Sequence, residues 1–168
     1  VIELMAEAGF TDFSFPFESG NGRILKKWSS NKWDINNTDV KGLIEALKKN
    51  NIRMDANYII GFPDETYEEV MNTIKFAKQN AEWGCDTSCF FICMPLPGTS
   101  MYDYCIENGL LDKDFNIDKM NWRKANMINT PVSQQELEDI RDKAWDEVNS
   151  DEWKTNRKKL IVAEPNIG

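Results

Sequence analysis

The chain has 168 residues, 41% of them hydrophobic and 29% charged, and it contains no histidine. These fractions are ordinary for a globular protein of about one domain, and no run approaches the roughly 20 apolar residues that cross a bilayer. The formal net charge of −8 argues against an extended nucleic-acid-binding surface. Without histidine, this chain cannot form a Ser-His-Asp or Cys-His catalytic centre or an H-E-x-x-H zinc site.

The start of the chain, VIELMAEAGF, has no basic segment of the kind that opens a signal peptide, and it indicates the end of an amphipathic helix. Because the chain also lacks an initiating Met, we expect it to begin in the middle of a larger protein. Four cysteines in this length do not indicate a secreted disulfide scaffold. We therefore expect a cytoplasmic protein with no membrane segment.

A strand and a long helix are predicted first. Residues 11–19 are rich in aromatic side chains, which favours a strand, and Pro16 suits an edge strand or a bulge. Residues 37–51 carry apolar side chains at a helical period, with lysines near the end that interact favourably with the helix dipole. Asn37 or Thr38 is expected to cap the start of this helix.

A second strand, a second helix and a third strand follow. Residues 52–63 predict a strand, and Thr66 and Glu69 form a capping-box pattern that opens a helix running to about Asn80. Residues 87–94 are strand-like again. Strands joined by helices are typical of a parallel sheet with right-handed crossovers. We expect an α/β fold with three parallel strands side by side in sequence order and helices covering one face.

Beyond Pro97 the pattern changes and becomes mostly helical. A short helix is expected up to Gly109, then an irregular segment over 112–131, and then an amphipathic helix that opens with the capping-box pattern Ser133–Glu136. The last residues, 158–168, have no clear assignment. The change of pattern predicts a domain boundary near residue 108, with an α/β part over 1–108 and a mostly helical C-terminal extension over 109–168.

Three of the four cysteines, Cys85, Cys89 and Cys93, stand four residues apart and raise the question of an iron–sulfur cluster. In a strand a four-residue step advances about 13 Å, so the outer two would lie roughly 26 Å apart. In a helix the outer two would lie about 12 Å apart. Only a wrapped loop could bring all three sulfurs around one cluster. The aromatic and β-branched residues between them favour a buried strand in which Cys89 and Cys93 act as small hydrophobes.

Three motifs in fixed order carry a resemblance to a known family. They are FPFESGNGRILKKW (15–28), NYIIGFPDET (57–66) and PLPGT (95–99). Together they resemble the second half of the radical S-adenosylmethionine (SAM) enzymes, and the similarity runs from about Val1 to Leu111. No single motif decides the matter, but the three in sequence are specific. The family's C-x-x-x-C-x-x-C motif does not occur in this chain, and the run that begins at Cys85 has another spacing.

The resemblance implies the C-terminal half of a partial TIM-type (β/α)6 barrel. It implies that the whole enzyme cleaves SAM reductively to a 5′-deoxyadenosyl radical, which starts radical chemistry on an unknown substrate. The four-iron four-sulfur cluster would be bound by the missing N-terminal half, so the fragment alone should be inactive. Many relatives with this pattern also carry an upstream cobalamin-binding domain, so the resemblance leaves cobalamin open as a further cofactor of the whole protein.

The resemblance also implies cofactor-binding residues at the ends of the strands. Glu18 and Ser19 would hydrogen-bond the polar part of SAM, either its ribose hydroxyls or its methionyl ammonium group. The other reading is a solvated strand-to-helix turn in which Ser19 caps the helix. Neither reading assigns a catalytic residue or a metal ligand to this chain.

The adenine of SAM would contact the next two strand ends. The backbone of Ile60, Gly61 and Phe62 would pass alongside the ring, because Gly61 has no side chain to keep a flat ring away. Met94 and Pro95 would lie at the edge of the adenine, with core packing as the other explanation for the Met94 side chain.

Four more polar residues near the second strand receive weaker assignments. Glu65 and Thr66 are expected to serve the start of the helix. Asp55 and Asn57 lie on the strand itself, and one face of that strand must point into the barrel, which suggests substrate contact.

Two other functions stay open from the sequence. One is a non-catalytic α/β binding module that has lost the cluster. The other is a small iron–sulfur electron carrier that uses Cys85, Cys89 and Cys93. The expected partners are a small-molecule cofactor, an unknown substrate and the missing N-terminal half of the protein, with no nucleic acid evident and no membrane.

Overall fold

The structure is a computed structural model that describes residues 1–151 and 154–155. Residues 158–168, to which the sequence assigned no helix or strand, lie outside the described residues. Within the described ranges, none of the helices is both long and apolar enough to cross a membrane. In chain order the elements are α1 (Ile2–Glu7), β1 (Asp12–Glu18), α2 (Gly22–Trp28), α3 (Val40–Lys49), β2 (Arg53–Ile60), α4 (Tyr67–Trp83), β3 (Thr87–Ile92), α5 (Ser100–Glu107), a one-turn 3-10 helix (Ile117–Lys119) and α6 (Gln134–Val148).

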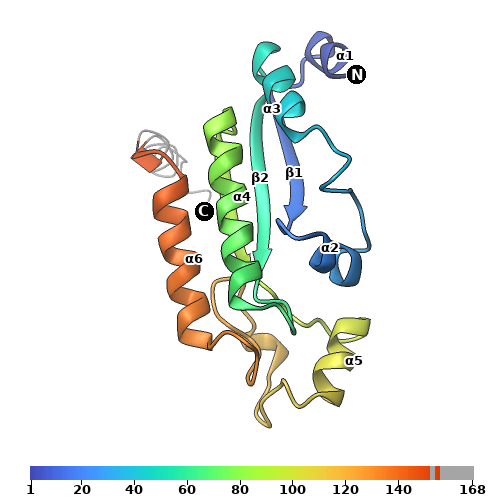
Figure 1. The fold of residues 1–168 in the computed structure, drawn as a ribbon, viewed down its shortest axis with the longest axis vertical. Helices are drawn as coiled ribbons and strands as arrows, with labels where there is room; N and C mark the ends of the chain where they lie inside the picture. Colours follow the sequence, from blue (N-terminus) through green and yellow to red (C-terminus); the bar gives the residue numbers. More distant parts are fainter. Residues whose placement is uncertain (152–153, 156–168) are drawn as a thin grey trace, which may run out of the picture.

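The three strands form one open parallel sheet in the order β1-β2-β3 (Figure 1). Phe15 lies opposite Ala56, and Asn57 lies opposite Cys89. The predicted α/β fold with parallel strands in sequence order is therefore confirmed. Helices α3 and α4 provide the crossovers, and α2 is an additional short helix that follows β1 directly.

The two faces of the sheet differ in their surroundings. On β2, Met54, Ala56, Tyr58 and Ile60 are buried and belong to the main core. Helices α3 and α4 pack on this side of β2, and α6 packs on β3. The alternate β2 residues, such as Asn57, are only partly buried. The second face of this sheet is therefore open in the described chain, whereas parallel sheets are usually covered on both faces.

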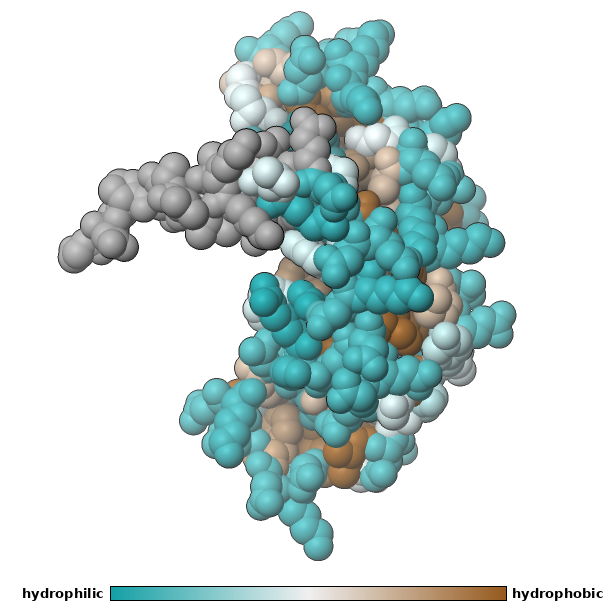
Figure 2. All heavy atoms as spheres, turned by 90° about the vertical axis from the view of Figure 1, so that its left-hand side faces the viewer, coloured by the Kyte–Doolittle hydropathy of each residue, from teal (hydrophilic) through white to brown (hydrophobic). Residues whose placement is uncertain are grey.

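Helix α6 belongs to the main core of the sheet although it follows a long irregular segment. Leu137 and Ala144 are buried in the same cluster as the residues of β2. Ser133 accepts a hydrogen bond from the Glu136 amide at 3.3 Å, which caps the helix start and is one of the two hydrogen bonds of the predicted capping box. The outward side of α6 is mostly hydrophilic, as the space-filling view of that side shows (Figure 2).

Two predicted helix boundaries were wrong. The helix predicted over 37–51 begins at Val40, because the cap is Asp39, whose carboxylate accepts a hydrogen bond from the Gly42 amide at 2.8 Å. The preceding residues form a turn instead, in which the Thr38 amide donates to the Asp34 carbonyl at 3.0 Å. Helix α4 continues past Asn80 to Trp83, because left-handed Gly84 ends it.

The outer edge of β3 is occupied by groups from the C-terminal part of the chain. The Asn149 side chain hydrogen-bonds both backbone groups of Ser88, at 2.9 Å and 2.8 Å. The Arg141 guanidinium donates to the Phe90 carbonyl at 3.3 Å. The Ile92 amide donates to the Trp122 carbonyl at 2.7 Å. In the described part of the chain β1 pairs only with β2, so the edge of β1 remains open.

Candidate functional site

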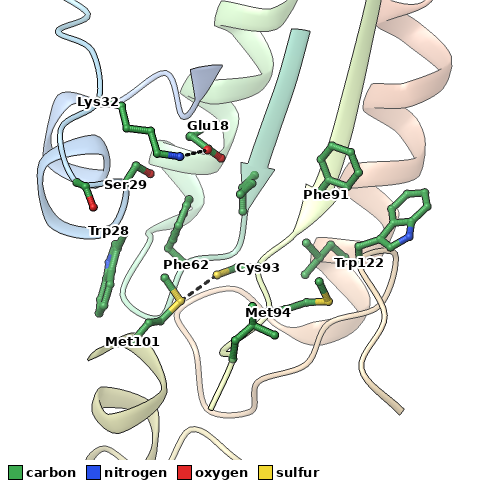
Figure 3. A pocket seen from close by; sticks show the side chains of 14 residues that line it. Glu18, Trp28, Ser29, Lys32, Phe62, Phe91, Cys93, Met94, Met101 and Trp122 are labelled. Atoms are coloured by element: carbon green, nitrogen blue, oxygen red, sulfur yellow. Dashed lines mark hydrogen bonds and ion pairs between the residues drawn. The ribbon is translucent and has the colours of Figure 1, made fainter. Parts of the chain in front are cut away.

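A cavity of about 410 Å³ lies at the C-terminal ends of the three strands, where parallel α/β proteins generally bind ligands (Figure 3). This volume falls in the range of small-molecule sites. Its lining residues come from the strand ends, from α2 and the loop after it, from the start of α5 and from the irregular segment: Glu18, Trp28, Ser29, Ser30, Lys32, Ile59, Phe62, Phe91, Ile92, Cys93, Met94, Leu96, Met101 and Trp122.

An ion pair forms the polar end of the cavity. The Lys32 ammonium donates to Glu18 Oε1 at 3.0 Å, and Figure 3 shows the two side chains pointing toward each other. The Glu18 side chain is only 11% exposed, whereas that of Lys32 is 54% exposed. Ser29 and Ser30 line the same end. A carboxylate is thus held at the cavity by a lysine that can move away at little cost.

Glu18 reaches this position through an unusual backbone turn. The register of β1 shifts between Pro16 and Glu18, and β1 is an outer strand of the sheet, as Pro16 suggested. Glu18 has φ +63°, and the Ser19 amide donates to the Phe17 carbonyl at 2.7 Å, the hydrogen bond of a γ-turn. A residue other than glycine in this region carries strain of about 1–2 kcal/mol, and such strain is concentrated at functional sites.

The rest of the cavity wall is mainly apolar. Phe62, Cys93 and Met101 lie side by side, with the Cys93 and Met101 sulfurs 3.3 Å apart (Figure 3). Opposite the ion pair, the Phe91 and Trp122 rings meet edge to face with centroids 5.2 Å apart. The cavity therefore offers one charged end and a broad apolar remainder, which suits a ligand that is polar at one end and flat or apolar at the other.

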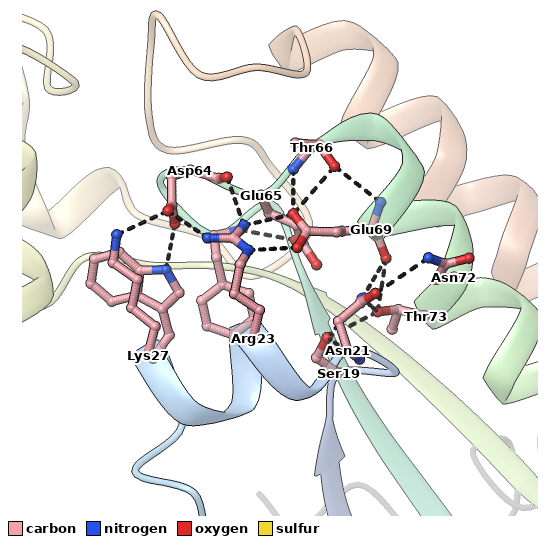
Figure 4. Close-up of polar contacts among 12 residues, drawn as sticks. Ser19, Asn21, Arg23, Lys27, Asp64, Glu65, Thr66, Glu69, Asn72 and Thr73 are labelled. Carbon is pink, nitrogen blue, oxygen red and sulfur yellow. Dashed lines mark hydrogen bonds and ion pairs between the residues drawn. The ribbon is translucent and has the colours of Figure 1, made fainter. Parts of the chain in front are cut away.

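A charged network holds α2 against the turn between β2 and α4 (Figure 4). The Arg23 guanidinium binds both carboxylate oxygens of Glu69 at 2.6 Å and also donates to Asp64 at 2.7 Å. The Trp28 indole donates to the same Asp64 carboxylate at 2.7 Å. Partial burial acts to raise the pKa of Asp64, but the hydrogen bonds from Lys27, Trp28 and Arg23 outweigh it and lower the pKa to about 2. The network thus fixes Trp28 as a cavity wall.

Three of the seven residues implied to bind the cofactor line the cavity: Glu18, Phe62 and Met94. The other four are not among the lining residues: Ser19, Ile60, Gly61 and Pro95. The Ser19 hydroxyl lies 3.1 Å from the Thr73 hydroxyl and accepts from the Asn21 amide, so its hydrogen bonds join the strand end to α4. The cap of α2 is Asn21 rather than Ser19.

The turn after β2 is shaped by Gly61 and Glu65. Gly61 has φ +77°, and an added Cβ would lie 2.9 Å from Leu137 of α6. One oxygen of Glu65 accepts from the amides of Gly61, at 2.6 Å, and Phe62, at 3.1 Å. Burial raises the pKa of Glu65 to about 7, although these two hydrogen bonds act to lower it. Thr66 forms the predicted capping box with Glu69, so of the expected pair only Thr66 caps α4.

The described residues do not fit an iron–sulfur cluster. The predicted strand is confirmed, but it ends at Ile92, so Cys89 lies within it and is partly buried, whereas Cys93 follows it. Cys85 precedes the strand, which therefore separates the outer two thiols. Burial raises the pKa of Cys85 to about 12 and also raises that of Cys93, which disfavours the thiolates that bind iron. In the part of the chain that the structure describes, no three His, Cys, Asp or Glu side chains are grouped to hold a metal ion.

The sequence interpretation missed several cavity residues. Trp28, Ser29 and Lys32 come from α2 and the loop that follows, where Ser30 and Asn31 are left-handed and turn the chain back over the cavity. Trp28 is the last residue of the FPFESGNGRILKKW motif, so its place in the cavity wall could have been predicted from that motif. Trp122 comes from the irregular segment, where no periodic pattern marked it.

Comparison with models of protein families yields no match. Among curated proteins, an uncharacterized methyltransferase of Pyrococcus horikoshii is 38% identical over 128 residues, 76% of this chain and 25% of that protein. Cytidylyl-2-hydroxyethylphosphonate methyltransferase of Streptomyces wedmorensis is 28% identical over 137 residues, 78% of this chain and 24% of that protein. The tRNA-2-methylthio-N(6)-dimethylallyladenosine synthase of Vibrio vulnificus is 34% identical over 91 residues, 53% of this chain and 18% of that protein.

The relatives are therefore enzymes, two of them named methyltransferases. The chain spans about a quarter of the length of these two relatives.

Proposed function

We propose that this chain is the C-terminal part of the barrel of a radical SAM enzyme of the transferase class, and that its cavity binds part of SAM. The single observation that carries the proposal is the cavity itself. It lies at the ends of three parallel strands and combines a buried carboxylate at one end with an apolar remainder. The order of the three motifs and the similarity to two methyltransferases support it.

The residues of the cavity fit the two chemically different ends of SAM. Glu18 would accept hydrogen bonds from the ribose hydroxyls or pair with the methionyl ammonium, while Lys32 would pair with the methionyl carboxylate. Phe62 and Met94 would pack against the adenine. In this arrangement the chain binds and orients the cofactor and keeps water from its apolar part.

When bound beside a reduced four-iron four-sulfur cluster, SAM supplies the radical chemistry of the reaction. We place the cluster ligands in the N-terminal half of the protein, because Cys85, Cys89 and Cys93 are separated along β3 and the outer two are buried. That half is thus the proposed partner of this chain, and the fragment alone should be inactive. The resemblance leaves cobalamin open as a further cofactor of the whole protein.

The proposal is tested by calorimetric titration of SAM into the whole protein, purified and reconstituted without oxygen. We expect the wild type to bind SAM and Glu18→Gln to bind it about ten- to a hundred-fold more weakly, since a hydrogen bond to a charged group contributes about 1.5–3 kcal/mol. Cys89→Ser is the matched control. It changes a strand residue of the same sheet and should leave SAM affinity and cluster content unchanged. Wild-type protein that carries a cluster and does not bind SAM would refute the proposal.

A further inference from the structure

Glu65 forms hydrogen bonds with both backbone groups of Phe62, the amide and the carbonyl. The Phe62 amide donates to Glu65 Oε2 at 3.1 Å, and the Glu65 amide donates to the Phe62 carbonyl at 3.0 Å. The same Oε2 accepts from the Gly61 amide at 2.6 Å. One side chain therefore binds the two consecutive amides of the turn that presents Phe62 to the cavity.

The second oxygen of this carboxylate has no hydrogen-bonding partner within the described residues. Glu65 is 1% exposed, and its Oε1 is buried and unpaired. Arg23 of α2, whose charge acts on Glu65, forms its ion pairs with Asp64 and Glu69 instead. A buried carboxylate without a cation is costly, and a neutral acid is much less so. A proton on Oε1 removes the charge and leaves Oε2 free to accept from both amides.

Among the residues that the structure describes, the surroundings of Glu65 offer no other means of balancing its charge. The charged or titratable groups that influence it are Arg23 from α2, Glu69 from α4 and the Cys93 thiol at the end of β3. Arg23 is neutralised by its two carboxylate partners, and Cys93 is buried in an apolar cluster with Phe62. Leu137 of α6 packs on the other side of the turn, against Gly61.

We propose that Glu65 is a positioning residue of the cavity, which fixes Phe62 in the wall through Oε2 and carries a proton on Oε1. It does not touch the ligand, because Phe62 lines the cavity and Glu65 does not. The proposal rests on the proposed function in assigning SAM as the ligand that Phe62 contacts. It adds that the shape of the adenine end depends on one buried acid.

The neutral acid has a close mimic in glutamine. In Glu65→Gln the amide oxygen can replace Oε2 as the acceptor, and the NH₂ group takes the place of the protonated oxygen. In Glu65→Ala both amides of the turn lose their acceptor. The side chain in Glu65→Asp is one methylene shorter and cannot reach both amides. This variant replaces Glu65→Ala in the experiments if the alanine variant does not fold. Glu68→Ala removes an exposed glutamate from the first turn of the same helix and is the matched control.

Two measurements on the whole reconstituted protein test the proposal. Amide hydrogen exchange, followed by mass spectrometry over residues 59–66, reports directly on Gly61 and Phe62. Glu65→Gln and Glu68→Ala should exchange like the wild type, whereas Glu65→Ala or Glu65→Asp should exchange these two amides at least about tenfold faster. SAM titration should show affinity within about threefold of wild type for Glu65→Gln, and at least about tenfold weaker for the alanine or aspartate variant.

Unchanged exchange in the alanine and aspartate variants would overturn the proposal, because the turn would then not depend on Glu65. Faster exchange with unchanged SAM affinity would overturn it too, because the turn would not position the wall. Loss of both properties in Glu65→Gln would refute the proton on Oε1. If the wild type does not bind SAM, the proposed function fails, while the exchange data still decide whether Glu65 fixes the turn.

Discussion

The Asn149 side chain pairs with Ser88 as a neighbouring β-strand would. Its Oδ1 accepts from the Ser88 amide at 2.9 Å, and its Nδ2 donates to the Ser88 carbonyl at 2.8 Å. Both residues are buried, at 4% and 1% exposure. The side-chain amide thus satisfies two backbone groups of an edge strand that water does not reach.

Replacement of Asn149 by alanine should destabilise the protein by about 2 kcal/mol or more, because two buried backbone groups lose their partners. Protonated Asn149→Asp retains an acceptor and an O–H donor, so its effect should be smaller at low pH; once ionised it has no donor and adds a buried charge, so its effect should be larger. Asn36→Ala, at an exposed turn, is the control and should change stability by less than about 0.5 kcal/mol. Urea denaturation provides the comparison, and equal effects of the two alanine variants would contradict the prediction.

Two glycines near the start of α2 should respond oppositely to alanine. A Cβ on Gly20 would lie 2.9 Å from the Asn72 carbonyl oxygen and 3.0 Å from Thr73 Cα, both backbone atoms of α4. Gly20→Ala should therefore cost about 1–3 kcal/mol. A Cβ on Gly22 would meet Ile35 at an ordinary 3.7 Å, so Gly22→Ala should be neutral or stabilising. Thermal unfolding of both variants checks this, and a stable Gly20→Ala would show that α4 can move away.

The strain at Glu18 can be separated from its charge. Glu18→Ala and Glu18→Gly both remove the carboxylate, but only glycine accepts φ +63° without strain. The glycine variant should be more stable than the alanine variant by about 1 kcal/mol. Both variants should bind SAM weakly. Equal stability in chemical denaturation would mean that the γ-turn relaxes when the carboxylate is lost.

Glu65 should make stability fall as the pH rises from about 4.5 to 7. Burial raises the pKa of Glu65 in the folded protein to about 7 from its ordinary value of 4.5, so the folded state retains a proton that the unfolded state releases. The stabilisation is complete below pH 4.5 and lost above pH 7, and its upper limit is about 3 kcal/mol. Glu65→Gln should lack this dependence. The low pKa of Asp64 affects stability only below about pH 4, outside this window. Unfolding of both proteins at pH 5 and pH 8 provides the comparison.

The fold was largely predictable from local patterns. Strand-like runs at 11–19, 52–63 and 87–94, with helical periods between them, predicted a parallel sheet with crossovers. Boundaries were less predictable, because several neighbouring side chains can cap one helix. At α3, Asn37, Thr38 and Asp39 are all suitable caps, and the hydrogen bonds of the turn around Asp34 leave Asp39 to bind the Gly42 amide.

The cavity was predictable only where the resemblance implied cofactor contact at the strand ends. Glu18 ends β1, and Phe62 and Met94 lie two residues beyond the ends of β2 and β3. Lys32 and Trp122 reach the cavity through loops whose path depends on long-range contacts. The Trp122 carbonyl, for example, is held by the Ile92 amide, thirty positions earlier in the chain. No periodicity in a single sequence reports such a contact.

The occupied edge of β3 determines which parts of this protein can be produced as separate polypeptides. The groups that occupy it come from Trp122, Arg141 and Asn149, all beyond the boundary predicted near residue 108. A shorter polypeptide ending there would have two unpaired outer strands, at opposite sides of one sheet. Such a molecule could stack head to tail with copies of itself, and nothing would close the stack. Residues 122–149 therefore limit the growth of the sheet to the side of β1.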